Sequence, residues 1–542
     1  MEHDEARFRM MYPRFLREAA FRLPPQLSNG LVFEDDRWRL GNAFYGALTW
    51  PISGSGRPVI VFLGARSGLE VAMSLMRTPE AAVLAVEPDP ERRALITHLL
   101  RESGRSAVVA DIPAARTWLA GRLVDHMRVD GRSHGLPEIA ELLDGARCGH
   151  LCGTYLSNLV DPLTMYRRAR DRLARSFFLR DDISGESIGS DRGPVEVEVS
   201  VVVPAYKVSA ELDQCLASLA GQTLEKLEVV VVDDGSPDDT GDKADAWAAR
   251  YPGRIRVIHK SNGGCASARM AGIDAARGEF IGLVDGDDWV APTMYEQLYR
   301  ASILRGAELA QCGYTEVFSD GSRLDYNDCA SDGGAHGFPD VTWDTVPSLG
   351  LKPTVWRRIY RTDFVRQNKL EFPQHIRRFD DLPFQFEALS LAKRMAVIPD
   401  CYYHYRQGRP GQDIAVRDDR LFVHFDIFDW LRTRPMAWAD GRIEAQLVRV
   451  ELNTHLWALG RIEPQFKSEY LRRAQAQLLL NRVHLGFMQL LRIAAQAGPR
   501  ALRLVAGAAV RALLGGKHSG RMPPVQSSPT SSGTVSQPHA GV

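Results

Sequence analysis

Acidic and turn residues follow three short apolar segments in the middle third of the chain. The segments, each with the residues that follow it, are 199–203 with Pro204 and Tyr206, 227–232 with Asp233 and Asp234, and 280–284 with Asp285 and Asp287. A short apolar run followed by a helical pattern is typical of an α/β sheet, which presents ligand groups at the carboxyl ends of its strands. Carboxylates gathered there can hold a divalent cation against phosphate oxygens. The sequence therefore predicts a site for a nucleotide diphosphate.

The composition is that of a globular protein with more than one domain. At 542 residues the chain is too long for one core, and its 45% apolar and 25% charged content is ordinary. Lys+Arg and Asp+Glu both number 67, so the net charge is zero and nucleic acid is not an expected partner. Seven scattered cysteines predict reduced thiols in a cytoplasmic protein. The sequence has no recognisable signal peptide and no run of about 18 apolar residues.

Changes of pattern along the chain predict five segments. Residues 1–185 are expected to form a Rossmann-like α/β domain, 186–196 a polar linker, 197–415 a second α/β domain, 416–517 a helical region and 518–542 a disordered tail. The predicted fold class is α/β with a helical C-terminal region.

The first domain begins with the order strand, glycine-rich turn, helix, strand, acid. Gly64 and Gly68 belong to the turn, and Glu87 ends the second strand about 20 residues later, where an acid can bind a ribose hydroxyl. This stretch resembles FkbM-like class I methyltransferases, which implies that Gly64, Gly68 and Glu87 bind S-adenosylmethionine. Phe62 stands where that family has an acid. We therefore prefer the alternative, a Rossmann-like domain that lacks methyltransferase chemistry.

An ordered set of motifs runs from residue 199 to residue 406. In chain order they are Val-Val-Pro204-Ala-Tyr206, Asp233-Asp234-Gly-Ser, Asn262-Gly263-Gly with Arg269, Asp285-Gly-Asp287-Asp288-Trp, Phe-Asp380-Asp381-Leu-Pro and Tyr402-Tyr-His404-Tyr-Arg406. This segment resembles family 2 glycosyltransferases, which have the GT-A fold. The resemblance implies a GT-A domain at 197–415, a nucleotide-sugar donor, a glycan or lipid-linked hydroxyl acceptor, and a Mg²⁺ or Mn²⁺ ion.

Nine residues are predicted to bind the donor. They are Pro204, Tyr206, Asp233, Asp234, Asn262, Gly263, Arg269, Asp285 and Asp287. Pro204 cannot donate to a strand ladder, so it frees the following turn to meet the base, with Tyr206 as a stacking face. The carboxylate of Asp234 can accept from the base, and Arg269 can pair with the diphosphate. The alternatives are core packing for Tyr206 and a solvated surface position for Arg269.

Two carboxylates and a histidine are predicted to bind the metal. Asp287 is the preferred ligand, Asp285 either shares the metal or faces the ribose, and His404 is a further candidate. The metal would neutralise charge on the leaving diphosphate. A structural role is the alternative for His404.

The acceptor side depends on the later motifs. By resemblance, Asp381 takes the position of the catalytic base, and the neighbouring Asp380 raises a carboxyl pKa, which suits a base. The alternative is a pair of acids that only favours a helix N-terminus. Trp356 and Arg358 fall in a segment that resembles the family's acceptor side, where Trp356 could stack on a sugar ring.

The resemblance implies one reaction, and two other hypotheses stay open. The reaction is a single displacement that inverts the anomeric centre of a UDP-sugar, in the synthesis of a cell-surface polysaccharide or glycoconjugate. The second hypothesis is a bifunctional enzyme that also methylates with S-adenosylmethionine. The third is a non-catalytic scaffold that binds nucleotide sugars.

The C-terminal region contains an apolar segment with regularly placed arginines. Residues 499–514 can form a basic amphipathic helix that includes Arg500, Arg503 and Arg511. Such a helix can lie on an anionic membrane surface, here the inner face of the plasma membrane. The alternative is ordinary packing against the rest of the protein.

Overall fold

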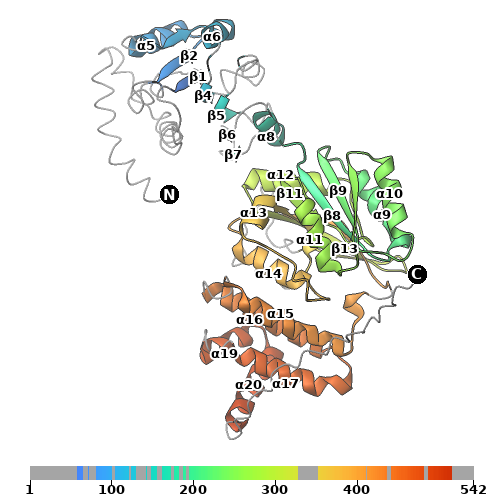
Figure 1. Cartoon of the computed structure of the whole chain (residues 1–542). Helices are drawn as coiled ribbons and strands as arrows, with labels where there is room; N and C mark the ends of the chain where they lie inside the picture. Colours follow the sequence, from blue (N-terminus) through green and yellow to red (C-terminus); the bar gives the residue numbers. More distant parts are fainter. Residues whose placement is uncertain are drawn as a thin grey trace, which may run out of the picture. The chain divides into compact units, whose positions relative to one another are not determined.

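The chain, seen here in a computed structural model, divides into two compact units, Met1–Ala415 and Val416–Val542 (Figure 1). The structure describes residues 58–64, 71, 81–100, 104–120, 122, 124–129, 142, 148–155, 161–171, 176–181, 187–190, 195–327, 352–409, 412–435, 441–480 and 486–515. The predicted tail 518–542 and the predicted site residue Gly68 lie outside these ranges.

The first sheet has the strand order β3-β2-β1-β4-β5-β6-β7. Its strands are β1 Val59–Leu63, β2 Ala82–Val86, β3 Ala107–Val109, β4 Val124–Val129, β5 Cys148–Tyr155, β6 Ser176–Asp181 and β7 Ser187–Ser190. Strands β1 to β6 run parallel, and β7 is antiparallel to β6. Without β7 this is the strand order of dinucleotide-binding folds. The chain adds strands toward one edge of the sheet up to β3 and then crosses to β4, on the other side of β1, where the order continues toward the opposite edge. The first sheet is therefore Rossmann-like, as expected.

Helices between these strands complete the first α/β layer. They include α5 Pro90–Leu100, α6 Ile112–Leu119 and α8 Pro162–Asp171. Four of the five residues of β1 and of β2 are buried, as expected for parallel strands covered on both faces. The Asp111 carboxylate accepts from the Ala114 N–H at 2.9 Å and so caps the start of α6.

Strand β7 falls inside the stretch 186–196 that the composition suggests is a linker. Its residues Ser187–Ser190 pair with β6 in an antiparallel ladder. A polar, irregular sequence does not reveal such an edge strand, because the hydrogen bonds that define it come from a partner strand rather than from its own periodicity.

The second sheet has the order β10-β9-β8-β11-β15-β13-β16-β12, with β14 paired to β13. Its strands are β8 Val199–Ala205, β9 Leu227–Asp233, β10 Ile255–His259, β11 Phe280–Leu283, β12 Trp289–Val290, β13 Leu309–Val317, β14 Arg323–Tyr326, β15 Arg358–Arg361 and β16 Met395–Arg406. Strands β10, β9, β8 and β11 run parallel, and every residue of β8 and β9 is buried. These parallel strands therefore form the centre of the second α/β domain and end at one edge.

Six helices accompany the second sheet among the residues that the structure describes. They are α9 Ser209–Ala220, α10 Thr240–Arg250, α11 Cys265–Ala275, α12 Met294–Arg305, α13 Thr362–Gln367 and α14 Asp381–Leu391. Helix α11 packs closely on β8 because Gly272 has no side chain, and a Cβ there would come within 2.2 Å of Val202. This close approach fixes the helix that carries Arg269.

The second unit is helical among its described residues. Its helices are α15 Val423–Thr433, α16 Gly441–Leu459, α17 Pro464–Leu480, α19 Phe487–Gln496 and α20 Pro499–Gly515. Side chains of α16, α17, α19 and α20, among them Leu452, Leu478, Leu490 and Val505, form one apolar core. None of the helices in the ranges that the structure describes is both long and apolar enough to cross a bilayer.

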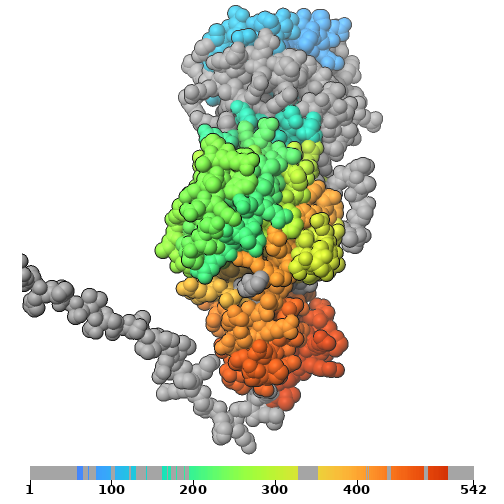
Figure 2. All heavy atoms as spheres, turned by 90° about the vertical axis from the view of Figure 1, so that its right-hand side faces the viewer, coloured from blue at the N-terminus to red at the C-terminus, as the bar shows by residue number. Residues whose placement is uncertain are grey.

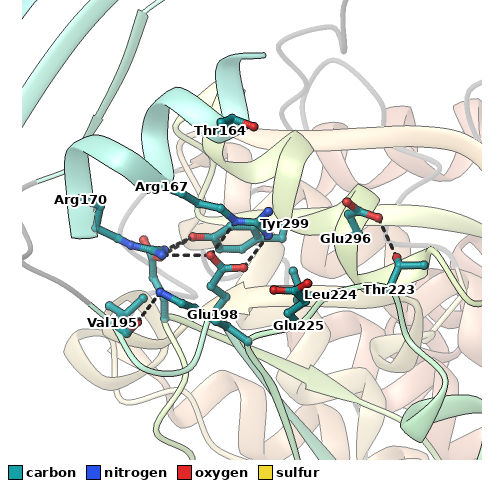
Figure 3. Close-up of polar contacts among 12 residues, drawn as sticks. Thr164, Arg167, Arg170, Val195, Glu198, Thr223, Leu224, Glu225, Glu296 and Tyr299 are labelled. Carbon is teal, nitrogen blue, oxygen red and sulfur yellow. Dashed lines mark hydrogen bonds and ion pairs between the residues drawn. The ribbon is translucent and has the colours of Figure 1, made fainter. Parts of the chain in front are cut away.

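Helix α8 is held to the second α/β domain by a buried polar network (Figure 3). Arg170 donates to Glu198 at 3.0 Å and to the Tyr299 hydroxyl at 2.6 Å. Arg167 donates twice to Glu198, at 2.8 and 2.7 Å. Arg170 also lies 3.5 Å from Glu279, and the Arg170, Glu198 and Glu279 side chains are 0% exposed. Removing one of these charges would leave the others buried without compensation.

We predict that Arg170→Met in the full chain destabilises the Met1–Ala415 unit by about 3–5 kcal/mol, because Glu198 and Glu279 lose a buried partner. Urea unfolding followed by fluorescence measures the change. Arg300→Met is the matched control: its 2.6 Å pair with Asp161 is 33% and 40% exposed, so it should cost less than about 1 kcal/mol. Equal effects of the two variants would contradict the buried network.

Candidate active site

The carboxyl ends of the parallel strands bring the predicted residues to one edge of the second sheet. Ala205 of β8 stands opposite Asp233 of β9, which stands opposite His259 of β10. Tyr206 follows β8, and Asp285 follows β11 by two residues. The order of the strands therefore places side chains from distant parts of the chain around one space, as predicted from their positions after apolar runs.

Asp233 is engaged on both oxygens by neighbouring groups. One accepts from the Ser236 N–H at 3.0 Å, and the other lies 3.0 Å from His259 Nδ1. Burial opposes its charge, but the hydrogen bonds from Ser236 and His259 lower the pKa of Asp233. The hydrogen bond to Asp233 raises the pKa of His259, and a second bond to Asp245 acts in the same direction.

Asp234 organises the glycine loop instead of presenting open oxygens. It accepts from Lys260 Nζ at 2.7 Å, from the Gly263 N–H at 3.0 Å and from the Gly264 N–H at 2.8 Å. The side chain is 2% exposed. We expected this carboxylate to contact the base. In the structure its oxygens instead accept hydrogen bonds from the N–H groups of the loop. Gly264 has φ +90°, which glycine adopts readily.

Arg269 lies at the centre of the site, 3% exposed. Its guanidinium donates to Asp285 at 2.8 Å, to Asp380 at 3.1 Å and to Asp381. Burial works against the charge, but Asp381 and the other carboxylates raise the pKa of Arg269 well above its ordinary value. The alternative of a solvated surface position is therefore excluded, because the partners of Arg269 in this structure are the site's own acids.

Asp381 has the electrostatics of a base. It is the first residue of α14, and Asp380 precedes it. Burial raises the pKa of Asp381 to about 7; Arg269 opposes this rise, while the charges of Asp380 and Asp285 add to it. The pair lies at the start of a helix, as the structural alternative expects, and both acids also accept from Arg269.

Backbone strain occurs beside two of the site residues. In the described part of the chain, three non-glycine residues have positive φ: Lys207 at 54°, Lys369 at 51° and Phe379 at 55°. Lys207 follows Tyr206, and Phe379 precedes Asp380. Strained backbone of this kind persists where the surrounding structure requires it, often at ligand-binding sites.

The loop after β11 carries three acids with different environments. Asp288 is 0% exposed and accepts from the Tyr403 hydroxyl at 2.7 Å and from the Arg406 N–H at 2.8 Å. Burial and the charge of Asp287 raise the pKa of Asp288 well above its ordinary value. Asp288 therefore anchors the loop and leaves Asp285 and Asp287 at its open side.

Asp287 is paired with an arginine that sequence reasoning missed. Arg409 donates to its carboxylate at 2.8 Å and to the Lys207 carbonyl oxygen at 2.7 Å. Burial, with the charge of Asp285, raises the pKa of Asp287, so a nearby cation is favourable. No group of three or more His, Cys, Asp or Glu side chains is assembled to hold a metal within the described ranges. His404 is thus not brought into a ready metal site with Asp285 and Asp287.

His404 lies on β16 opposite Trp289 of β12. Its ring lies 5.3 Å from that of Trp289, centroid to centroid. Burial lowers the pKa of His404, and its Nδ1 has no hydrogen-bond partner among the residues that the structure describes. The side chain packs in the sheet, in keeping with the structural alternative.

The two predicted acceptor residues are buried. Trp356 is 4% exposed and stacks on Tyr403 and Tyr405, with ring centroids 4.2 and 5.3 Å away. Arg358 is 0% exposed and donates to Gln311 at 2.7 Å and to the Thr354 carbonyl oxygen at 2.9 Å. Neither side chain presents a surface to a sugar, so we correct both predictions. Local sequence did not reveal this, because the covering groups come from β13 and β16.

Four other donor predictions have open or structural positions. Tyr206 is 42% exposed, which leaves a ring face accessible. Pro204 is the penultimate residue of β8, and its carbonyl oxygen would lie 3.1 Å from a Cβ at Gly286. Asn262 and Gly263 lie in the loop before α11, and a Cβ at Gly263 would come within 2.6 Å of Ser267. The close approach expected at Gly263 is therefore a contact with Ser267 within the protein.

The first sheet contributes a separate feature at the end of β2. Glu87 is 3% exposed, and its Oε1 accepts from the Asp89 N–H at 3.1 Å. Its Oε2 is buried and has no hydrogen-bond partner in the described part of the chain. Gly64 has φ +78° directly after β1. These two residues occupy the carboxyl edge where dinucleotide-binding folds hold ligands.

The sequence did contain signals for two of the missed residues. Lys260 follows strand β10 directly, so it had to reach the same sheet edge as Asp233 and Asp234. Asp288 extends the acidic motif by one residue. No local signal marks Arg409, whose partner Asp287 is 122 residues away in the chain.

Comparisons with known proteins match the part of the chain that contains this site. The model of glycosyl transferase family 2 matches residues 200–397. Glycosyltransferase GlyG of Streptococcus pneumoniae is 31% identical over 224 residues, which cover 39% of this chain and 70% of that protein. Glycosyltransferase EpsJ of Bacillus subtilis is 35% identical over 216 residues, 39% of this chain and 61% of that protein.

Two further matches are less similar. The poly(ribitol-phosphate) beta-glucosyltransferase of Bacillus spizizenii is 26% identical over 223 residues, 41% of this chain and 34% of that protein. A crystal structure of S. aureus TarS 1-349 with UDP-GlcNAc has a TM-score of 0.46 and 20% identity, and covers 59% of this chain and 92% of that chain. The chain spans about three fifths of the length of its first curated relatives.

The motifs from Pro204 to Asp381 at the edge of the second sheet thus fall within the matched residues 200–397. The chain belongs to glycosyl transferase family 2.

Proposed function

We propose that this protein transfers a sugar from a UDP-sugar to a hydroxyl group of a growing cell-surface polymer, with inversion at the anomeric carbon. One observation carries the proposal: Asp285 and Asp381 meet at one sheet edge through Arg269, with Asp287 on the same loop as Asp285. The similarity to the poly(ribitol-phosphate) beta-glucosyltransferase of Bacillus spizizenii supports an acceptor of this class.

The donor nucleotide is assigned to the ends of β8 and β9. Tyr206, 42% exposed, offers a stacking face for a base. Asp234 acts indirectly, since it shapes the loop of Gly263 and Gly264 that borders the site. Lys260 donates a hydrogen bond to the Asp234 carboxylate. Its ammonium group adds positive charge where the donor phosphates would lie.

A divalent metal fits the loop after β11. Asp287 already holds a cation, the guanidinium of Arg409 at 2.8 Å. Asp287 with Asp285 would hold Mg²⁺ or Mn²⁺, which supplies charge neutralisation for the leaving diphosphate. Two carboxylates suffice, because Mg²⁺ commonly takes its other ligands from phosphates and water. If a metal took the place of the Arg409 guanidinium at Asp287, Arg409 could pair with phosphate through its planar guanidinium.

Asp381 is proposed as the base. Its carboxylate removes the proton from the acceptor hydroxyl while that oxygen attacks the anomeric carbon and the diphosphate leaves with the bonding electrons. A pKa raised to about 7 makes it a better proton acceptor than an ordinary aspartate. Arg269 holds Asp381 in position and keeps part of its population ionised. It acts through Asp381, as a positioning residue.

A second candidate function comes from the first sheet. Glu87 lies at the end of β2, and its buried Oε2 has no hydrogen-bond partner among the described residues. An acceptor in this position favours a nucleoside ligand with ribose hydroxyls. We propose S-adenosylmethionine as the ligand to test, since the resemblance of this region pointed to it. The non-catalytic scaffold has no comparable observation in its favour.

Asp287→Asn should reduce metal-dependent release of nucleotide from the preferred donor by at least about a hundredfold, since an electrostatic group at the leaving diphosphate is lost. The assay uses purified full-length protein, a panel of UDP- and GDP-sugars, and Mn²⁺ or a chelator. Asp274→Asn, an exposed acid on α11, is the control and should behave as wild type. Full activity with chelator or in Asp287→Asn would refute the metal assignment.

The pH profile tests Asp381. Only the ionised base accepts a proton, so kcat/KM should fall about tenfold per unit as the pH drops below the raised pKa near 7. Asp380→Asn removes a charge that raises this pKa, so the acidic limb should move to lower pH. Asp274→Asn should leave the limb in place. A limb that does not move in Asp380→Asn would contradict the assignment of Asp381 as the titrating base.

Isothermal titration of the full chain with S-adenosylmethionine tests the second candidate. Binding that weakens at least about tenfold in Glu87→Gln would support a ribose contact, since a charged hydrogen bond contributes about 1.5–3 kcal/mol. Asp89→Asn, which alters a neighbouring exposed acid, is the control. Absence of binding in the wild-type protein would remove S-adenosylmethionine and leave Glu87 without this role.

A further inference from the structure

Exposed apolar side chains gather near the end of the second unit. The large hydrophobic residues exposed in the described part of the chain number eight, and five of them lie between residues 480 and 510. They are Leu480 at 51%, Phe487 at 37%, Met488 at 67%, Leu502 at 39% and Val510 at 54% exposed. Such a concentration marks an interaction surface, whereas single exposed apolar residues are ordinary.

Helix α20 has separate buried and exposed apolar faces. Ala501, Leu504 and Val505 are buried in the core of the unit. Leu502, Ala506 and Val510 are exposed and four residues apart, so they follow one side of the helix. Packing within the unit therefore accounts for one apolar face and leaves the second uncovered among the described residues.

Arginines border this second face. Arg500 and Arg503 are exposed on α20, and Arg492 is exposed on α19 one turn after Met488. Helices α19 and α20, the red region of Figures 1 and 2, are joined by a turn at Gly498, whose φ of +107° suits glycine. Each of the two helices therefore exposes both apolar and basic side chains.

The charge of this region differs sharply from that of the whole chain. No Asp or Glu follows Glu469 in the sequence, although the chain as a whole is neutral. Its basic residues after that position are Arg472, Arg473, Arg482, Arg492, Arg500, Arg503, Arg511, Lys517 and Arg521. A surface with this one-sided charge attracts an anionic partner.

We propose that α19 and α20 bind the surface of an anionic lipid membrane, with Met488, Leu502 and Val510 entering the interface and Arg492, Arg500 and Arg503 meeting the headgroups. The combination of apolar and basic side chains on one helix surface is what interfacial helices use. Each arginine near such a surface strengthens binding about fivefold. This binding is independent of sugar transfer.

The same features argue against other occupants. A second copy of the chain would place one basic surface against another, and like charges repel. A soluble polyanion such as nucleic acid would use the arginines but gains little from exposed Met488 and Val510. The segment after residue 515 is rich in Ser, Pro and Gly and has few large apolar residues to cover this face.

Flotation with lipid vesicles tests the proposal on the full-length protein, without donor or acceptor. Vesicles of phosphatidylcholine alone are compared with an equal mixture of phosphatidylcholine and phosphatidylglycerol, at low and high salt. The charge variant is R492Q/R500Q/R503Q, and its matched control is R250Q/K393Q/K467Q, which removes three exposed cations that precede this basic region. The apolar variant is M488S/L502S/V510S. Circular dichroism checks that each variant keeps its helices.

We expect binding to the anionic vesicles, weakened by salt and at least tenfold weaker in the charge variant than in its control. The apolar variant should also bind more weakly. Equal binding to both vesicle types, no binding, or unchanged binding in both variants would overturn the proposal. Self-association that the apolar variant abolishes, or binding of DNA without vesicle binding, would assign the surface to a second copy or to a polyanion and would equally overturn it.

Discussion

The guanidinium of Arg269 is almost completely shielded from water, so it must keep its carboxylate partners. These ion pairs hold distant parts of the second α/β domain together. A buried cation without compensation costs several kcal/mol. Its partners Asp285 and Asp381 come from the loop after β11 and from the start of α14, the latter 112 residues away in the chain. The close packing of α11 on β8 at Gly272 fixes the origin of the arginine. Three elements are thereby set around one space.

The same site carries more acid than nearby cations neutralise. Burial and mutual repulsion raise the pKa of Asp287, Asp288 and Asp381 above their ordinary values. An environment of this kind favours the arrival of a cation at one acid and of a proton at another. The pair between Asp287 and Arg409 satisfies the first demand within the protein, and Asp381 is poised for the second. The electrostatics that cost stability in such a cluster are those that suit the proposed chemistry.

Elements outside the second sheet add properties that the transferase site does not need by itself. Helix α8 ties the Rossmann-like sheet to the second domain through Arg170, Glu198 and Glu279, a buried contact rather than a flexible tether. The C-terminal helices instead share an apolar core of their own. These helices carry an excess of positive charge, whereas the chain as a whole is neutral. The total composition therefore does not reveal this local asymmetry.

The sequence by itself predicted the central strands β8, β9 and β11 and the residues that follow them, although it did not reveal β7. Apolar periodicity and turn residues are local, so the ends of β8, β9 and β11 and the edge position of Asp233 and Asp285 could be predicted. Tertiary structure decided which side chains meet. Trp356 and Arg358 proved to be buried, and Arg409 proved to pair with Asp287. These outcomes depend on partners from other strands or on contacts more than 100 residues apart, and no local pattern of residues encodes such partners.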